Sequence, residues 1–266
     1  MSLVATILGC GSSGGVPRVG AGWGACDPKN PRNRRRRCSL LVERVAEAGR
    51  TTVLVDTGPD VREQLLDAEV AWIDAVLFTH EHADHTHGID DMRVLAIHQR
   101  RLIEAHADDK TADLLIRRFG YCFETPPGSQ YPPILALKRL DDGIPIHLSG
   151  RGGGLTAVPF MMHHGDTNAL GFRFGNLAYS SDVNGLPPES EALLQDLDVW
   201  IVDALRYTQH PSHWSLADAL AWIERIKPRR AILTNLHTDM DYDTLCRSLP
   251  AHVVPAYDGM RIAFED

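Results

Sequence analysis

The chain has 266 residues, of which 44% are hydrophobic and 23% are charged, so it can bury a sizeable core. Its formal net charge of -8 argues against general binding to nucleic acid or to anionic membranes, and no apolar run is long enough to span a bilayer. The five cysteines are scattered and odd in number, and the N-terminus does not resemble a signal peptide, which favours a cytoplasmic protein with free thiols.

Short apolar runs rich in Val, Ile, Leu and Phe, each bounded by Gly, Asp or Pro, predict β-strands along the chain. These runs are Val4–Leu8, Ser39–Val42, Thr52–Val55, Ala75–Phe78, Leu155–Phe160, Gly171–Phe174, Leu177–Tyr179, Trp200–Val202, Ala231–Leu233 and Arg261–Phe264. Amphipathic patterns between some of them predict helices over residues 59–70, 90–107, 188–197 and 215–227.

The order of these elements, strands then helices in two rough halves, predicts an α/β (α+β) fold of two packed sheets with helices on the outer faces. Residues 108–154 are the least regular stretch, and we interpret them as an insertion or lid-like segment. The prediction is therefore a single domain that spans residues 1–266.

The stretch AVLFTHEHADHTHGIDD, residues 75–91, places many potential metal ligands directly after a hydrophobic strand. In an extended segment the side chains of His80, His82 and Asp84 point the same way, and His85 follows as the chain turns towards a helix. Imidazole and carboxylate groups at this spacing suit zinc, manganese or iron, and one strand end can serve two adjacent metals. The alternative is a solvated, acidic, His-rich turn.

The motif THEHADH resembles the signature of the metallo-β-lactamase superfamily, whose fold is a four-layer αββα sandwich. The later motifs that this resemblance requires follow in order as MMHHGD, LAYSSD and AILTNLH. The resemblance implies two divalent metal ions, zinc or manganese. One ion would be bound by His80, His82 and His164 (chosen over His163), the other by Asp84, His85 and His237, with Asp182 bridging both.

Five further stretches resemble a bacterial phosphodiesterase branch of this superfamily, whose best-known member opens phosphoribosyl 1,2-cyclic phosphate. They are GCGSSGGVP, RRRRCSLLVE, VLVDTGPDVREQLL, HTHGIDDMR and HPSHWSLADAL. Members of the branch often hold a structural zinc with a Cys cluster after GVP and a second His after the last metal ligand. Here the loop offers only Cys26 and Cys38, and Met240 lies three residues past His237, so we expect no structural zinc.

The resemblance implies hydrolysis of a small phosphodiester, cyclic or nucleotide-like, because two metals can generate hydroxide near neutral pH and bind a phosphoryl oxygen. Asp84 would help to orient the hydroxide, and His213 would protonate the leaving group as a general acid. The alternative is that His213 is a helix-capping or surface residue. His210 is the other candidate for the general acid.

Two other functions remain open on the same residues. One is a thioester or lactone hydrolase, and the other is a non-catalytic metal-binding protein. The tRNA-maturing relatives carry a long RNA-gripping arm, and the chain has no Gly-rich basic insertion of that type, so we expect no stable binding of nucleic acid and none to membranes. The run Arg34–Arg37 and Arg93 can bind phosphate or lie solvated, and a homodimer is compatible with the sequence.

Overall fold

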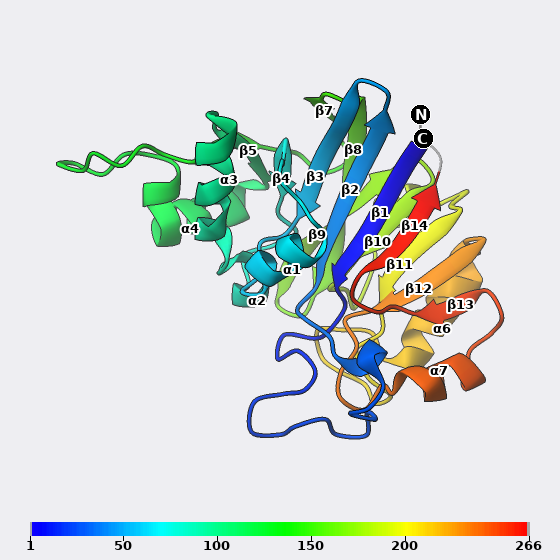
Figure 1. Cartoon of the computed structure of the whole chain (residues 1–266). Coiled ribbons are helices and arrows are strands. Elements are labelled where there is room, and N and C mark those ends of the chain that lie inside the picture. Colours follow the sequence, from blue (N-terminus) through cyan, green and yellow to red (C-terminus); the bar gives the residue numbers. More distant parts are fainter. Residues whose placement is uncertain (1, 265–266) are drawn as a thin grey trace.

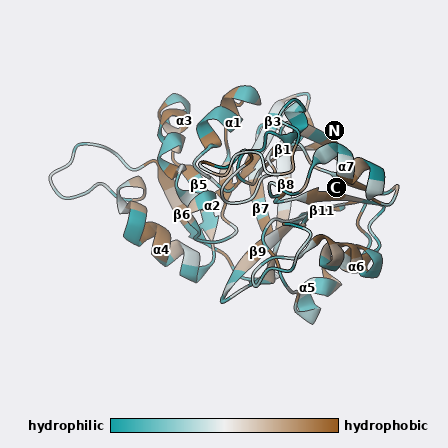
Figure 2. Cartoon of the chain, turned by 90° about the horizontal axis from the view of Figure 1, so that it is seen from below, coloured by the Kyte–Doolittle hydropathy of each residue, from teal (hydrophilic) through white to brown (hydrophobic). Residues whose placement is uncertain are grey.

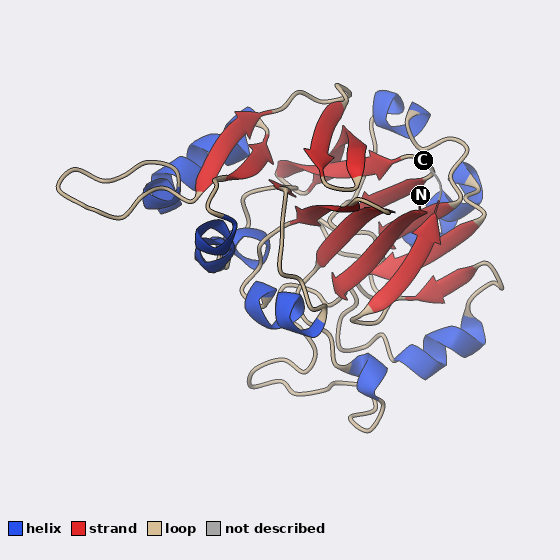
Figure 3. Cartoon of the chain, turned by 45° about the horizontal axis from the view of Figure 1, so that its top comes forward, coloured by secondary structure: helices blue, strands red, loops and turns tan. Residues whose placement is uncertain are grey.

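The computed structural model describes residues 2–264 and contains two packed β-sheets with helices outside them (Figures 1 and 3). The strands of the first sheet are β1 (Ser2–Gly9), β2 (Ser39–Ala46), β3 (Gly49–Val55), β4 (Ala75–Leu77), β5 (Ile103–Ala107), β6 (Leu135–Arg139) and β14 (Met260–Phe264). Those of the second are β7 (Ile146–Gly150), β8 (Gly153–His164), β9 (Thr167–Phe174), β10 (Leu177–Ser180), β11 (Val199–Asp203), β12 (Arg230–Thr234) and β13 (Val253–Pro255).

Both sheets are mixed and have seven strands, in the orders β14-β1-β2-β3-β4-β5-β6 and β13-β12-β11-β10-β9-β8-β7. Strands β3 to β6 are parallel neighbours, as are β10 to β13, and the remaining pairs are antiparallel. The carboxyl ends of neighbouring parallel strands meet at one edge of a sheet, which is where loops from distant parts of the sequence come together.

Helices cover the outer face of each sheet. They are α1 (Val61–Asp67), α2 (Ala83–Thr86), α3 (Met92–Gln99), α4 (Asp109–Phe119), α5 (Pro188–Ala192), α6 (Leu216–Ile226) and α7 (Tyr242–Ser248), with short 3₁₀ turns η1 (Pro31–Asn33), η2 (Ile89–Asp91) and η3 (Gly120–Cys122). Among residues 2–264, no helix is long and apolar enough to cross a membrane.

Three apolar layers hold the sheets and helices together, because successive side chains of a strand point to opposite faces. Val53 and Val55 of β3 lie in the layer between the sheets, whereas Leu54 lies in the layer under the helices of the first sheet. In β11, Ile201 points to the central layer and Trp200 to the layer under α6 and α7. Figure 2 shows hydrophobic and hydrophilic residues side by side on α4 and α6. These layers confirm the predicted αββα arrangement.

The helix predicted over residues 90–107 is wrong, because only its first half is helical. Helix α3 ends at Gln99, and Arg100 adopts a left-handed conformation with φ of 55° that stops the helix. The chain then enters β5, which pairs with β4 and β6, and its Ile103 and Ala105 are fully buried in the layer under the helices of the first sheet.

Residues 108–154, expected to form an insertion or lid, instead build regular elements of both sheets. They contribute α4, the edge strand β6 of the first sheet and the edge strand β7 of the second. Within this stretch an irregular loop after η3 extends away from the body between Phe123 and Ile134, which both pack against the core; Figure 1 shows the loop in green.

Arg35 is a buried cation that joins the loop after β1 to the turn after β12. Its Nη2 donates to the Met240 carbonyl (2.7 Å) and to Asn33 Oδ1 (3.2 Å), and its Nη1 donates to the His237 carbonyl (3.4 Å). The side chain is 2% exposed, and among the described residues no carboxylate forms an ion pair with it.

Arg35→Met should therefore leave buried carbonyls without donors and lower the free energy of unfolding by roughly 2–5 kcal/mol. Urea unfolding of the variant beside the wild type measures this difference. The control is Arg34→Met, because Arg34 is exposed and its loss should change stability by less than about 0.5 kcal/mol. Equal effects at the two positions would contradict a structural role of Arg35.

The Asp241 carboxylate holds the same loop to the start of α7. It accepts hydrogen bonds from the Asp27 amide (3.1 Å), from Asn33 Nδ2 (2.7 Å) and from the Thr244 amide (2.9 Å). Burial raises the pKa of Asp241, but the hydrogen bonds from Thr244, Asp27 and Asn33 outweigh it and hold the pKa at about 2.

A folded pKa below the value of about 3.9 in the unfolded chain means that the ionised carboxylate stabilises the fold above pH 4. Asp241→Ala should cost about 0.5–2 kcal/mol at pH 7, as the loss of a helix cap does. The difference from the wild type should shrink as the pH falls from about 4 to about 2, because the wild type then loses the same charge. Asp243→Ala, at an exposed neighbour, is the matched control, and a pH-independent difference would count against the assignment.

Candidate metal centre

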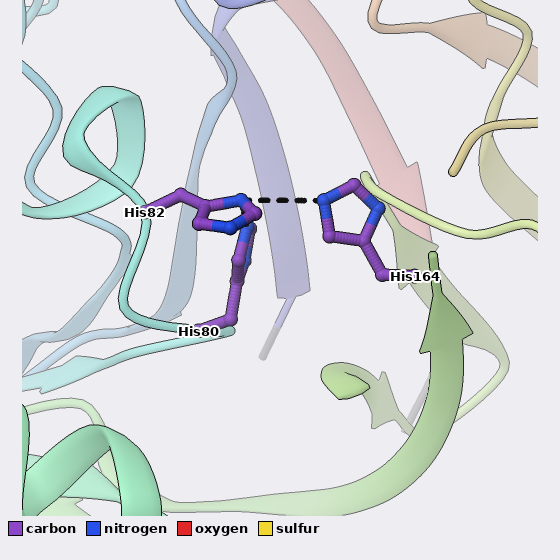
Figure 4. A group of neighbouring side chains, drawn as sticks. All are labelled: His80, His82 and His164. Carbon is purple, nitrogen blue, oxygen red and sulfur yellow. Dashed lines mark hydrogen bonds between the residues drawn. The ribbon is translucent and has the colours of Figure 1, made fainter. Parts of the chain in front are cut away.

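Three histidines from two separate segments meet at the edge where β4 and β8 end. His80 and His82 lie in the loop between β4 and α2, and His164 is the last residue of β8. The distance from His82 Nδ1 to His80 Nε2 is 2.9 Å, and the distance from His82 Nδ1 to His164 Nε2 is 3.3 Å (Figure 4). One ring nitrogen from each residue lies within 4.8 Å of the others, which is the spacing of a three-imidazole site.

A second group of ligand atoms lies directly beside the first and shares His80. Its other members are His85 of α2 and Asp182, which follows β10. His85 Nε2 is 3.2 Å from Asp182 Oδ2 and 3.4 Å from Asp84 Oδ2, so Asp84 borders this group. Asp182 also forms a third group with His164 and His213 and therefore links the two sides of the site.

Neighbouring oxygens fix the orientation of each imidazole, as outer partners of metal ligands do. His80 Nδ1 lies 2.9 Å from Thr79 Oγ1, His85 Nδ1 lies 2.7 Å from Asp56 Oδ2, and His164 Nδ1 lies 2.7 Å from the Ser212 carbonyl. When each Nδ1 donates its proton to these acceptors, the Nε2 lone pairs of the three rings point into the site.

The donor set fits divalent metal ions. Imidazole nitrogens and carboxylates are ligands for zinc and manganese, and a bound cation explains why these imidazoles and carboxylates lie so close together. Asp182 Oδ2 is buried and has no hydrogen-bond donor among the described residues, as expected of an atom that binds a cation. Burial raises the pKa of Asp182, but the charge of the neighbouring His85 outweighs it, so the pKa lies well below its usual value and the carboxylate is ionised.

The structure does not bring His237 into any of these groups. Its Nδ1 lies 3.2 Å from Asp239 Oδ1 and 3.2 Å from Thr238 Oγ1. Asn235, two residues earlier, lies beside Asp182 instead, with 3.4 Å between Asn235 Nδ2 and Asp182 Oδ1. Of the three residues expected to bind the second ion, Asp84 and His85 lie together and His237 lies apart from them.

The choice of His164 over His163 agrees with the geometry. The His163 side chain is exposed, and its backbone pairs with Gly185 across an isolated bridge. His164, in contrast, is buried and faces His82 and His213.

His213 lies next to the metal ligands in the loop before α6, with its ring centroid 4.7 Å from that of His164. Its Nδ1 is 2.7 Å from Asp203 Oδ2 at the end of β11, which leaves Nε2 for another partner. Burial lowers the pKa of His213, but the charge and hydrogen bond of Asp203 outweigh it and raise the pKa to about 9. A protonated imidazole beside a metal site can donate a proton to a leaving group.

The backbone that follows His213 is held in place. The Trp214 amide donates to the Val183 carbonyl (2.8 Å), and Ser215 begins α6 with a capping box to Asp218. The Trp214 ring also stacks on Trp222 of α6, with 5.3 Å between centroids. The direction of the His213 side chain is therefore set by rigid elements.

Helix α4 supports the loop that carries the first two histidines. Lys110 Nζ lies 2.8 Å from Glu81 Oε1, and Arg118 Nη1 donates to the Glu81 carbonyl at 2.6 Å. Burial raises the pKa of Glu81, but the hydrogen bond and charge of Lys110 outweigh it and lower the pKa. A helix from the stretch that was expected to be an insertion thus holds Glu81 between His80 and His82.

The remaining residues singled out in the sequence lie in other contacts. Arg36 pairs with Asp67 and Asp258, Arg37 with Asp60, and Arg93 with Asp90. Cys26 Sγ accepts from Arg35 Nη1 at 3.8 Å and Cys38 Sγ contacts the Gly11 carbonyl, and neither thiol belongs to a group of potential ligands within residues 2–264. The lack of a structural zinc stays a prediction.

Sequence reasoning missed three residues that contact the site, namely Asp56, Asp203 and Asn235. Each directly follows or ends a buried strand, in LVDTG, WIVDAL and ILTNL. A polar residue at the carboxyl end of a buried strand was the only signal, and the same signal also marks ordinary turns and caps.

The sequence is similar to proteins of a known hydrolase superfamily. The sequence model of the beta-lactamase superfamily domain matches residues 51–235. An octanoyltransferase of Porphyromonas gingivalis is 32% identical over 265 residues, which are 98% of this chain and 51% of that protein. A ribonuclease Z of Bradyrhizobium sp. is 31% identical over 159 residues, which are 58% of this chain and 48% of that protein. The chain spans about half the length of these curated relatives.

Solved structures share the whole fold. A diphosphatase from the PhnP family superposes with a TM-score of 0.88 at 33% identity and covers 99% of this chain and 98% of its own. Zinc-bound PqqB from Methylobacterium extorquens superposes with a TM-score of 0.75 at 16% identity, over 97% of this chain and 99% of its own. The chain therefore belongs to the beta-lactamase superfamily and has the metallo-β-lactamase fold that its motifs predicted.

Proposed function

We propose that the protein is a metal-dependent hydrolase that cleaves a small phosphodiester, cyclic or nucleotide-like. The observation that carries this proposal is the union of two adjacent ligand groups, which share His80 and are linked by Asp182, with a His213–Asp203 pair at their side. A pure metal-binding protein has no use for a partly buried proton donor beside its ligands.

Two divalent ions bound by these ligands would supply a hydroxide near neutral pH and balance charge on a phosphoryl oxygen. The carboxylates of Asp84 and Asp182 would offset the charge of the ions and orient the oxygen that attacks phosphorus. As the bond from phosphorus to the leaving oxygen breaks, His213 Nε2 donates its proton to that oxygen and the alcohol departs. Asp203 keeps the imidazole in the orientation and protonation state that this step needs.

The substrate class follows from charge and from similarity. The formal net charge of -8 disfavours a long polyanion such as RNA, whereas a small diester carries a single charge on its reacting group. Similarity to a diphosphatase over the full length supports chemistry at phosphorus. We therefore favour a small diester over the RNA substrate that similarity to a ribonuclease Z suggests.

The test is a comparison of substrates on one preparation supplied with zinc or manganese. Bis-para-nitrophenyl phosphate and a 2′,3′-cyclic nucleotide represent diesters, and a short single-stranded RNA represents the alternative polyanion. His164→Ala should abolish turnover of the diesters. His163→Ala is the matched control and should retain it, because His163 is exposed and lies outside the ligand groups. No turnover of either diester, or turnover of RNA alone, would refute the proposal.

A second function is favoured by one specific observation, the 32% identity to an octanoyltransferase over 98% of this chain. A metal site that polarises a phosphoryl oxygen also polarises a carbonyl, so acyl substrates are chemically accessible. An octanoyl thioester and a lactone therefore belong in the same assay. Turnover of either one, with no turnover of the diesters, would assign the protein to acyl chemistry.

A further inference from the structure

Asn235 has an unusual backbone at the end of a buried strand. It directly follows β12, is 3% exposed and adopts a left-handed conformation with φ of 61°. Such a conformation is costly for a residue with a side chain and is least costly for Asn, so it persists where surrounding contacts require it. Its neighbours support this reading, because the Leu236 amide donates to the Cys10 carbonyl and the His237 amide to the Leu205 carbonyl.

The Asn235 amide contacts both halves of the candidate site. Its Nδ2 donates to the Ser181 carbonyl at 2.9 Å and to Asp182 Oδ1 at 3.4 Å. The same Nδ2 lies 3.2 Å from Nδ1 of His213, whose proton is directed to Asp203 at 2.7 Å. A single amide thus fixes the carboxylate that links the ligand groups and packs against the ring of the proton donor.

Asn235 also stands where the end of β12 could have supplied another imidazole. The first ligand group has three imidazoles, those of His80, His82 and His164. The second group shares His80 with the first, and its one further imidazole is His85, which lies beside the carboxylates of Asp84 and Asp182. His237 does not complete the set, because its ring contacts Thr238 and Asp239.

We propose that Asn235 is a positioning residue that makes the two metal positions unequal. It holds Asp182 in place but adds no imidazole, so the position at Asp84, His85 and Asp182 binds its ion more weakly than the three-histidine position. The inference rests on the metal site of the proposed function and does not depend on the substrate.

The test is a calorimetric titration of the chelator-treated protein with zinc alone. The wild type should bind in two events of clearly different affinity. Asn235→Ala should weaken the weaker event most, by roughly 10–100-fold, as the loss of an outer partner of a ligand does. Asn235→His should tighten that event by roughly 10-fold or more, because it adds an imidazole nitrogen beside Asp182.

Two controls separate this role from a structural one. Asn235→Gly relieves the left-handed backbone yet also lacks the amide, so it should reproduce the zinc affinity of Asn235→Ala without its loss of stability. His237→Ala should leave both events unchanged. Two equal events in the wild type, a weaker event that disappears in His237→Ala, or no zinc binding would overturn the inference. Unequal zinc binding without hydrolysis of any diester would support it and reject the proposed function.

Discussion

Asp182→Ala is expected to remove metal from both ligand groups rather than from one. Asp182 belongs to the group with His80 and His85, and its carboxylate also lies within 4.8 Å of a ring nitrogen of His164, a member of the three-histidine group. Its Oδ2 has no hydrogen-bond donor among the described residues and lies 3.2 Å from His85 Nε2, so a cation is the partner that satisfies it. Elemental analysis of protein purified without chelator should give about two transition-metal ions per chain for the wild type and clearly fewer for the variant.

Turnover of a diester should fall together with metal content, and by more than the roughly 10–100-fold that follows from loss of an outer partner. Asp198→Ala is the matched control, because Asp198 pairs with Arg229 just before β11, at the end of that strand opposite to Asp203. It should keep both ions. A wild type that binds no transition metal and recovers none on reconstitution would refute the metal site, and an Asp182→Ala protein with full occupancy would refute the linking role.

The fold could be predicted from the sequence because its strands are buried and short. The run Val53–Val55 is apolar at every position, since β3 is covered on both faces. The helix predicted beyond Gln99 failed for a local reason. Arg100 turns left-handed without the Gly or Asn that usually signals such a stop, so the two-residue spacing of Ile103 and Ala105 is the one sign of the strand that follows.

The local part of the candidate site was equally accessible, because His80, His82, Asp84 and His85 lie within six residues of one another. The distant part was not. In an extended strand end, the side chains of residues 235 and 237 would point the same way. The left-handed turn at Asn235 separates them, so that Asn235 faces Asp182 and His237 does not. Sequence spacing alone has no means of showing that turn.

Asp56 and Asp203 show the same limit. Each follows or ends a strand, as many capping aspartates do, and each gains a role only from its neighbour in space. Asp56 accepts from Thr79 and contacts His85, and Asp203 contacts His213. Asp56 and His85 are brought together by the parallel pairing of β3 with β4, and Asp203 and His213 by the loop that follows β11. Hydrophobic periodicity records neither contact.

His213→Ala is expected to slow hydrolysis in a way that depends on the leaving group. An alkoxide leaves poorly unless it is protonated, so a diester with an alkyl leaving group should lose roughly 10²–10⁴ in rate, the contribution of a general acid. Nitrophenolate leaves without a proton, and the loss for bis-para-nitrophenyl phosphate should be much smaller. Metal content should stay at the wild-type value. Equal losses on both substrates would mean that His213 positions phosphate or holds structure, and loss of an ion would make it a ligand.

The dependence on pH provides a second and independent measurement of this role. The carboxylate of Asp203 raises the pKa of His213 to about 9, against the effect of burial, so the proton donor is charged at neutral pH. For the alkyl diester, the rate of the wild type should fall as the pH rises through the pKa of this group, because the acid form is lost. Asp203→Asn removes the charge that raises the pKa and should move this decline to lower pH, while the nitrophenyl diester should show no such displacement. A decline at the same pH in Asp203→Asn and the wild type would assign it to another group and leave His213 without the role of proton donor.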